Sequence, residues 1–112
     1  MSESKGPVHE SEIERQEYPD RWSKNLVTAC QGATSGFNLG VAEYTSESFG
    51  ALQVHDDQEA VYVVSGAGEI LLGGTVYPVS PGSAVYIPKG TPHATRRTAK
   101  EPVKVVYTHG AP

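Results

Sequence analysis

Two stretches of this 112-residue sequence contain side chains that can bind a divalent metal ion. The first stretch contains Gln53, His55 and Glu59. The second contains His93, which follows the turn-forming sequence Pro88-Lys89-Gly90. The residues of the first stretch are all odd-numbered, and residues two apart on a strand share a face. We therefore expect two imidazoles, a carboxylate and an amide oxygen to converge, a set that suits a divalent transition metal.

These stretches resemble the two motifs of the cupin superfamily, and the resemblance covers about residues 36 to 108. The first motif usually reads Gly, His-x-His, Glu and Gly, and the chain resembles it at His55, Glu59 and Gly66. The second reads Gly, Pro-x-Gly, His and Asn, and the chain resembles it at Gly82, Pro88, Gly90 and His93. Gln53 replaces the first His, and Arg97 replaces the final Asn. The resemblance implies a small single-domain barrel with one bound metal ion.

The sequence does not determine whether the metal is iron, manganese, zinc or nickel. The type of reaction depends on that choice and is therefore also open. By resemblance, Gln-x-His with a Glu and a further His is the zinc set of cupin-type phosphomannose isomerases, whereas cupin dioxygenases carry three His and one Glu. In an oxygenase, Glu59 would tune the charge of an iron(II) ion. In an isomerase or lyase the metal acts as a Lewis acid, and Glu59 is the candidate catalytic carboxylate. Gln53 would bind the metal directly, bind it through water, or hydrogen-bond to the substrate.

Two further residues are candidates for substrate contact. Arg97 alternates with His93, so its guanidinium can face the same way and bind a carboxylate or phosphate. The alternative for Arg97 is a surface position on the barrel rim. Tyr107 is the tyrosine that we expect in the cavity. Asp57 is either a general base or a solvated loop carboxylate, and His109 is expected to be an exposed residue after the last strand.

The elements that must position these residues are short strands separated by turns. We expect strands at 25–30, 37–44, 53–55, 60–64, 69–72, 75–79, 84–87, 93–98 and 103–108. The pair Gly73-Gly74 predicts a two-residue hairpin turn, because glycine tolerates positive φ. This spacing favours an all-β fold, which the resemblance specifies as a cupin-type jelly-roll β-barrel. The prediction is one barrel domain at 25–112, preceded by a polar N-terminal arm at 1–24.

Composition excludes several classes of function. Nine basic and thirteen acidic residues give a net charge of -4, and no Lys/Arg cluster favours nucleic acid as a partner. No apolar run approaches the length of a membrane span, and the N-terminus lacks an apolar signal region. The single cysteine, Cys30, cannot form an internal disulfide. A cytoplasmic protein with neither nucleic-acid nor membrane partners is the expectation.

The sequence leaves more than one function open. The first is a small metal-dependent enzyme, an oxygenase or an isomerase/lyase, that acts on a small polar or anionic metabolite. The alternative is a non-catalytic cupin module that binds a sugar or another metabolite, and a third is a barrel with a vacant site. We also expect a homodimer, because exposed strand edges and the apolar side chains of Tyr62, Val64 and Tyr86 need covering.

Overall fold

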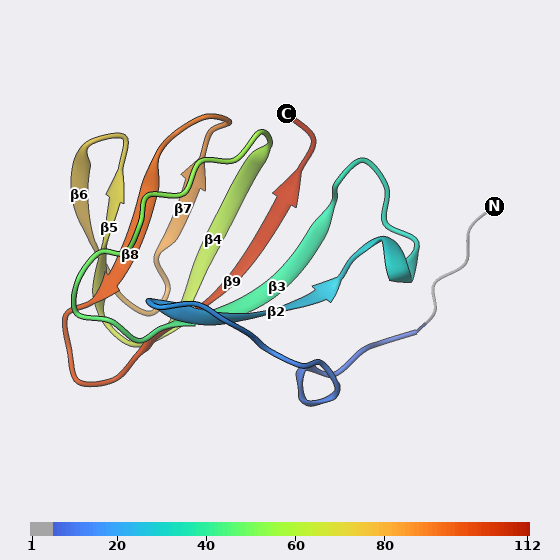
Figure 1. The fold of residues 1–112 in the computed structure, drawn as a ribbon, viewed down its shortest axis with the longest axis horizontal. Coiled ribbons are helices and arrows are strands. Elements are labelled where there is room, and N and C mark those ends of the chain that lie inside the picture. Colours follow the sequence, from blue (N-terminus) through green and yellow to red (C-terminus); the bar gives the residue numbers. More distant parts are fainter. Residues whose placement is uncertain (1–5) are drawn as a thin grey trace.

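The fold consists of two antiparallel β-sheets packed around one core (Figure 1), and the computed structural model describes residues 6–112. The larger sheet has the strand order β1-β2-β3-β9-β4-β7, and the smaller has the order β6-β5-β8. Two single-turn 3-10 helices are η1 (Glu10–Glu12) and η2 (Ala29–Gln31). The strands are β1 (Gln16–Glu17), β2 (Arg21–Val27), β3 (Asn38–Tyr44), β4 (Gln58–Ser65), β5 (Gly68–Leu72), β6 (Thr75–Val79), β7 (Ala84–Ile87), β8 (His93–Arg97) and β9 (Val103–Gly110). The chain is therefore the all-β jelly roll that its strand spacing predicts.

The core lies between the sheets and is built by period-two alternation. On β9, Val103, Val105 and Tyr107 are buried, whereas the residues between them are only partly covered. On β4 the buried Val63 is followed by the exposed Val64. Each fully buried valine stabilises the fold by about 1.5–3 kcal/mol relative to an exposed one. The cluster comprises Ala42, Val63, Ile70, Val79, Ile87, Val103, Val105 and Tyr107.

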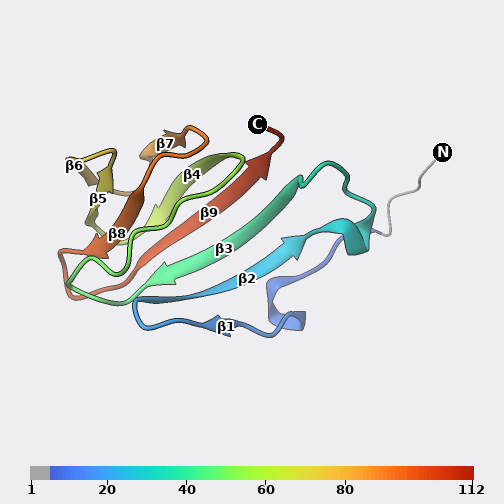
Figure 2. The same cartoon turned by 45° about the horizontal axis from the view of Figure 1, so that its top comes forward.

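The long connection from β3 to β4 runs along the free edge of β8, and Figure 2 shows it in green. Gln53 and His93 exchange both backbone hydrogen bonds, at 2.8 and 3.0 Å. Further along, the Gly90 N–H donates to the carbonyl of His55 at 2.9 Å. These bonds hold the connection at a fixed register beside β8, so its side chains reach the same end of the barrel as His93.

Most predicted strands are confirmed with small shifts of their ends, but two segments differ. Residues 53–55 form a single bridge to His93 and no strand, because the chain bends at residues 56–57 before β4 begins. Residues 28–30 turn into η2, because the Thr28 side chain accepts from the Cys30 N–H and Gly32 ends the turn with a left-handed φ of 97°. The Gly73-Gly74 hairpin is confirmed, with φ values of 56° and 87°.

The predicted N-terminal arm joins the larger sheet before residue 25. β2 begins at Arg21, and β1 pairs with it in antiparallel register. Further back, the Glu10 carbonyl accepts from Lys24 Nζ at 2.7 Å, and Lys104 Nζ lies 3.3 Å from Glu10 Oε1. The described part of the arm is thus held against its own sheet, and residues 1–5 lie outside the described residues.

Across residues 6–112, no helix has the length and apolar character needed to cross a membrane.

Candidate metal centre and pocket

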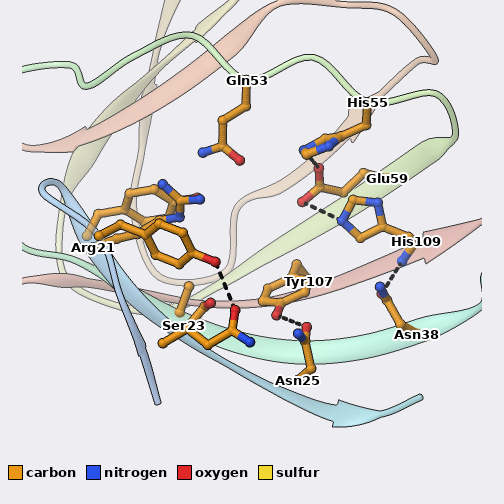
Figure 3. A pocket seen from close by; sticks show the side chains of 13 residues that line it. Arg21, Ser23, Asn25, Asn38, Gln53, His55, Glu59, Tyr107 and His109 are labelled. Carbon is orange, nitrogen blue, oxygen red and sulfur yellow. Dashed lines mark hydrogen bonds and ion pairs between the residues drawn. The ribbon is translucent and has the colours of Figure 1, made fainter. Parts of the chain in front are cut away.

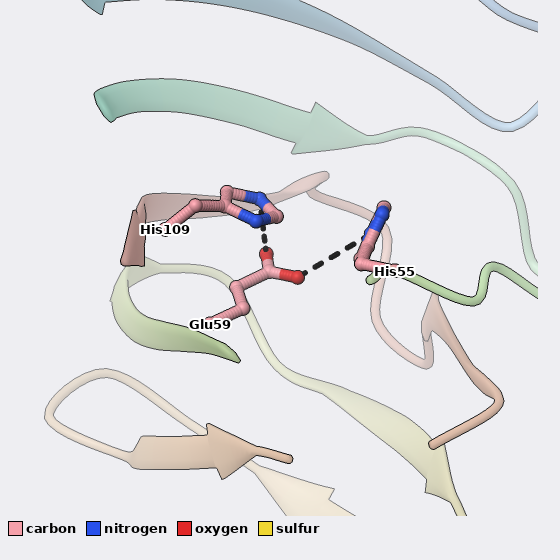
Figure 4. A group of neighbouring side chains, drawn as sticks. All are labelled: His55, Glu59 and His109. Carbon is pink, nitrogen blue, oxygen red and sulfur yellow. Dashed lines mark ion pairs between the residues drawn. The ribbon is translucent and has the colours of Figure 1, made fainter. Parts of the chain in front are cut away.

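Three imidazoles surround one buried carboxylate at the open end of the barrel. The carboxylate is that of Glu59 at the start of β4, and its direct cross-strand partner is His109 near the end of β9. The His55 and His93 Nε2 atoms each lie 3.5 Å from Glu59 Oε1. The His109 Nε2 atom lies 3.6 Å from Glu59 Oε2. Figure 4 shows how Glu59 reaches between His55 and His109.

The arrangement fits a metal ion. Glu59 Oε1 is buried and accepts no hydrogen bond from any of the described residues, although an unpaired buried oxygen is costly. One ligand atom from each of His55, Glu59 and His109 lies within 4.8 Å of the others. Two donors that each lie about 2.1 Å from a tetrahedral zinc ion are themselves about 3.4 Å apart. The separations around Glu59 are therefore those of ligands that share one ion.

Hydrogen bonds orient two of the three imidazoles toward this point. The His93 Nδ1 atom lies 2.9 Å from the carbonyl of Thr91, so Nδ1 carries the proton and donates it. The His109 Nδ1 atom lies 2.9 Å from Asp57 Oδ1 in the same manner. In both rings the Nε2 lone pair is left facing Glu59. Carbonyl and carboxylate partners of this kind are what metal-binding histidines use to fix tautomer and orientation.

Burial and neighbouring charges shift the pKa values of the histidines in opposite directions. Burial lowers the pKa of His55, and the opposing effect of Glu59 does not compensate. Burial also acts to lower the pKa of His93, but the neighbouring Glu59 carboxylate and the Thr91 carbonyl, which both favour the protonated ring, outweigh it and raise the pKa. His55 is therefore neutral and ready to bind metal near neutral pH, whereas His93 holds a proton up to higher pH.

A polar pocket of about 160 Å³ opens beside the cluster (Figure 3). Glu59 is the one carboxylate among its described lining residues. Burial raises the pKa of Tyr44 to about 12, and it raises that of Tyr107 as well, so both phenols remain protonated. The lining residues are Gln16, Tyr18, Arg21, Ser23, Asn25, Asn38, Ala42, Tyr44, Gln53, His55, Glu59, Tyr107 and His109.

The Tyr107 ring is positioned by a glycine and an amide. Tyr107 lies directly opposite Gly40 in the β3–β9 register, and a Cβ atom at Gly40 would overlap the Cζ and Oη atoms of the ring. The phenol donates to Asn25 Oδ1 at 2.5 Å. The missing side chain at position 40 therefore makes room for the ring, and Asn25 fixes the direction of its hydroxyl.

Residues 42–109 match the Cupin domain family, which is 68 of the 112 residues. The chain belongs to the cupin family. This cupin is 34% identical over 90 residues to Protein SchB of Streptomyces halstedii, covering 76% of this chain. It spans 62% of the length of that relative.

Solved structures of several cupin-like proteins have the same fold. The polyketide cyclase RemF from Streptomyces resistomycificus superposes with a TM-score of 0.79 and 21% identity, covering 93% of this chain and 78% of RemF. An RmlC-like cupin from Shewanella frigidimarina gives 0.78 and 13%, over 100% and 96% of the two chains. Ectoine synthase from P. lautus gives 0.78 and 24%, over 94% and 77%.

In this cupin, the predicted residues His55, Glu59 and His93 come together as described above. Gln53 reaches the same pocket, and Figure 3 shows its amide pointing into the open space. Tyr107 also lines the pocket. The expected reason, one regular strand face for residues 53 to 59, does not apply. The bend before β4 and the backbone bonds to β8 bring these side chains together instead.

Arg97 does not reach the pocket, so its predicted contact with substrate has no support in the fold. Its guanidinium donates to the carbonyls of Thr45 and Ala99, both at 2.8 Å, and it lies 3.3 Å from a carboxylate oxygen of Glu47. At the end of β8 the loop backbone offers carbonyls that bind the guanidinium outside the barrel. Arg97 therefore ties two loops together.

The expectation for His109 is wrong, because its side chain is only 12% exposed and belongs to the cluster. A sequence signal for this existed. Val103, Val105, Tyr107 and His109 alternate along one strand, so the buried face of β9 leads directly to His109. Asp57 is expected from the sequence to be either a general base or a solvated loop carboxylate. Its carboxylate instead accepts a hydrogen bond from His109.

Proposed function

We propose that this cupin is a metal-dependent enzyme in which His55, Glu59, His93 and His109 hold one divalent ion. We further propose that it catalyses a non-oxidative isomerisation, elimination or ring closure of a small oxygen-rich molecule. The observation that carries the proposal is the set of three imidazole Nε2 atoms around one buried carboxylate with an unpartnered oxygen. Gln53 is the fifth candidate, either as a weaker ligand or as a contact for the substrate.

When bound, the ion would supply Lewis-acid chemistry that polarises an oxygen of the substrate. Within the pocket, Glu59 is the group placed to move a proton, since it is the one carboxylate among the described lining residues. The phenols of Tyr44 and Tyr107 stay protonated at neutral pH and can donate hydrogen bonds to a substrate oxygen that gains negative charge. These roles suit removal of a proton next to a carbonyl, the common first step of isomerisation, elimination and carbon–carbon ring closure.

The fold relatives support an enzyme, because a polyketide cyclase and an ectoine synthase share this architecture. Their identities of 21% and 24% carry the fold alone, so reaction class rests on the pocket. An oxygenase is the second candidate. The set of three histidines and one carboxylate favours it, because by resemblance cupin dioxygenases carry the same set.

Metal analysis is the first test of this function. Protein produced with iron, manganese, nickel and zinc available should carry up to one ion per chain, and the His55→Ala/His93→Ala double variant should carry little. Full occupancy in the double variant would contradict the assignment. Equal and negligible metal in both proteins would favour the non-catalytic binding module.

The reaction class is tested with the metal-loaded protein and a set of small oxo and hydroxy compounds, under air and under nitrogen. Conversion that proceeds equally well under nitrogen, followed by NMR, is the expected result. Conversion that stops without oxygen and consumes it under air would instead establish the oxygenase.

We also propose that the chain forms a homodimer through the outward face of β4 and β7. Tyr62, Val64 and Tyr86 are 52%, 45% and 58% exposed there, and within residues 6–112 the outer edge of β7 has no partner strand. Light scattering at micromolar concentration should give twice the chain mass, and Tyr62→Lys/Tyr86→Lys should give the monomer. A monomeric wild-type protein would contradict the proposal.

A further inference from the structure

Arg21 brings a guanidinium into the pocket, at the beginning of β2. It is the one arginine or lysine among the described residues that line this pocket, and its side chain is 17% exposed. The sequence gives no motif for it. Figure 3 shows Arg21 on the side of the pocket away from His55, Glu59 and His109.

Two neighbours hold the guanidinium in place. Its Nη1 atom donates to Asp20 Oδ1 at 2.9 Å, and its Cζ atom lies 4.2 Å from the centre of the Tyr18 ring. Asp20 is itself fixed, because its side chain is only 10% exposed and packs where a side chain at Gly50 would clash. A guanidinium held by an ion pair and by stacking loses little freedom when it binds a ligand.

Part of the guanidinium remains available. Arginine has five N–H donors, and within the described residues Nε and Nη2 have no acceptor. These two nitrogens carry the parallel N–H groups that match the two oxygens of a carboxylate. Asp20 already balances the positive charge, so Arg21 offers directional hydrogen bonds more than it offers net charge.

The pocket limits what can lie between Arg21 and the cluster. Its volume of about 160 Å³ is close to the roughly 150 Å³ of an engineered cavity that binds benzene. A molecule with one ring, or a chain of comparable size, would fill it. Its other walls are polar, with Ser23, Asn25 and Gln53 among them, which suits a ligand with several oxygen atoms.

We propose that Arg21 binds the carboxylate of the substrate, so that the substrate class is a small oxo or hydroxy acid. The carboxylate lies on Arg21, and the oxo or hydroxy oxygen lies toward the cluster around Glu59. Only the position of the oxo or hydroxy oxygen beside the cluster rests on the proposed function. Carboxylate binding by Arg21 does not require a metal. Arg21 thereby takes the carboxylate-binding role for which Arg97 is one candidate in the sequence.

The test compares acids with their uncharged amides of the same shape. Binding of benzoate, benzamide, 2-hydroxybenzoate and 2-hydroxybenzamide is measured by calorimetry with metal-free and metal-loaded protein. The proteins are wild type, Arg21→Gln, Arg21→Lys and Arg15→Gln. Arg15 is the matched control, because it is 54% exposed, pairs with Glu17 and lies outside the pocket.

We expect metal-free wild type and Arg15→Gln to bind each acid about tenfold or more tightly than its amide, as hydrogen bonds to charged groups allow. The preference should vanish in Arg21→Gln and be intermediate in Arg21→Lys, which keeps the charge but not the paired N–H groups. Unfolding curves establish that each variant is folded. If Arg21→Gln does not fold, the comparison of wild type with Arg21→Lys tests the proposal.

The proposal is overturned if wild type binds the acids no more tightly than the amides, including the case in which it binds neither. It is also overturned if the preference survives in Arg21→Gln, or remains complete in Arg21→Lys. Metal-loaded protein separates this result from the proposed function. An acid preference without any gain from the metal would leave Arg21 as the carboxylate site and count against the metal-dependent reaction alone.

Discussion

The two ends of the barrel interior are built from the same strands and differ completely in chemistry. At the closed end, β4 and β9 contribute Val63 and Val103, which are 2% and 0% exposed. At the open end the same strands contribute Glu59 and His109, which face each other across the pair. A few residues along one strand thus separate a close-packed apolar core from a buried carboxylate with an unpaired oxygen.

The difference teaches that the site needs both the ends of the strands and the connection that precedes β4. Antiparallel pairing fixes which residues of β4 and β9 face inward, and a slip of one residue in β4 would turn Glu59 outward and away from His109. The remaining groups come from the connection before β4 and from the start of β8. Substitutions at the closed end should therefore change stability and have little effect on ligand binding. Substitutions at the open end should change ligand binding and have little effect on stability.

Removing a histidine from the open end should give the largest effect. In His93→Ala we expect metal affinity to fall by at least about a hundredfold, about 2.8 kcal/mol, because a donor is lost and Glu59 loses a neighbour. His9→Ala is the control, since His9 lies in the exposed arm and only caps η1. Titration of metal into metal-free protein measures both. Equal affinities in the two variants would remove His93 from the site.

Removing a valine from the closed end should lower stability and spare the metal. Val63→Ala should lower the free energy of unfolding by about 2 kcal/mol, because it leaves a cavity in a packed core. Its neighbour Val64 is 45% exposed, and Val64→Ala should cost less than about 0.5 kcal/mol. Urea unfolding gives these values. A loss of metal affinity in folded Val63→Ala would show that the two ends are coupled.

Loss of the hydrogen bond between Asp57 and His109 should lower metal affinity less than loss of a metal ligand. Asp57→Ala should weaken metal binding by about tenfold, the lower range for partners that orient a metal-binding histidine. Asp56→Ala is the matched control, because Asp56 is adjacent, its side chain is 98% exposed, and it pairs with Lys89 on the surface. If the Asp57 variant matched the Asp56 variant, the hydrogen bond to His109 would have no part in the site.

Acidification should affect the open end in a predictable direction. The pKa of His93 lies above 6.5, and a protonated imidazole cannot bind metal, so affinity should fall as the pH drops through that pKa. Metal binding at pH 6.5 should accordingly release a proton from a larger share of His93 side chains than of His55 side chains. Calorimetry in two buffers of different ionisation enthalpy counts the protons. An equal proton count for wild type and His93→Ala at pH 6.5 would contradict the raised pKa of His93.

Gln53 should give the smallest change, and the most informative one for its own role. If its oxygen is a ligand, Gln53→Ala should cost less affinity than His93→Ala because water can take the position, and Gln53→His should tighten zinc or nickel binding. If Gln53 contacts only the substrate, all three proteins should bind metal equally while binding of acids changes. The same metal titration separates the two roles.

Much of this site could be predicted from local sequence spacing, and the remainder could not for physical reasons. His55, Glu59 and His93 are recognisable because their spacing from nearby glycines and prolines resembles the cupin motifs. His109 follows from the alternation on β9, although no motif marks it. Arg21 could not be found in this way, since it reaches the pocket only through the pairing of β2 with β3. The predicted orientation of Arg97 toward the pocket is not found. Arg97 is the last residue of β8, and alternation along a strand no longer determines side-chain direction at its end.

The absence of a side chain at Gly40 has a consequence for how such a protein can change over generations. Gly40 lies outside the pocket wall, yet a Cβ there would collide with the Tyr107 ring and approach the Lys24 carbonyl. A substitution of Gly40 by alanine would force the Tyr107 ring, which lines the pocket, to leave its present position. Substrate range could thus drift through a residue that no ligand ever touches, and a comparison of lining residues alone would miss the cause.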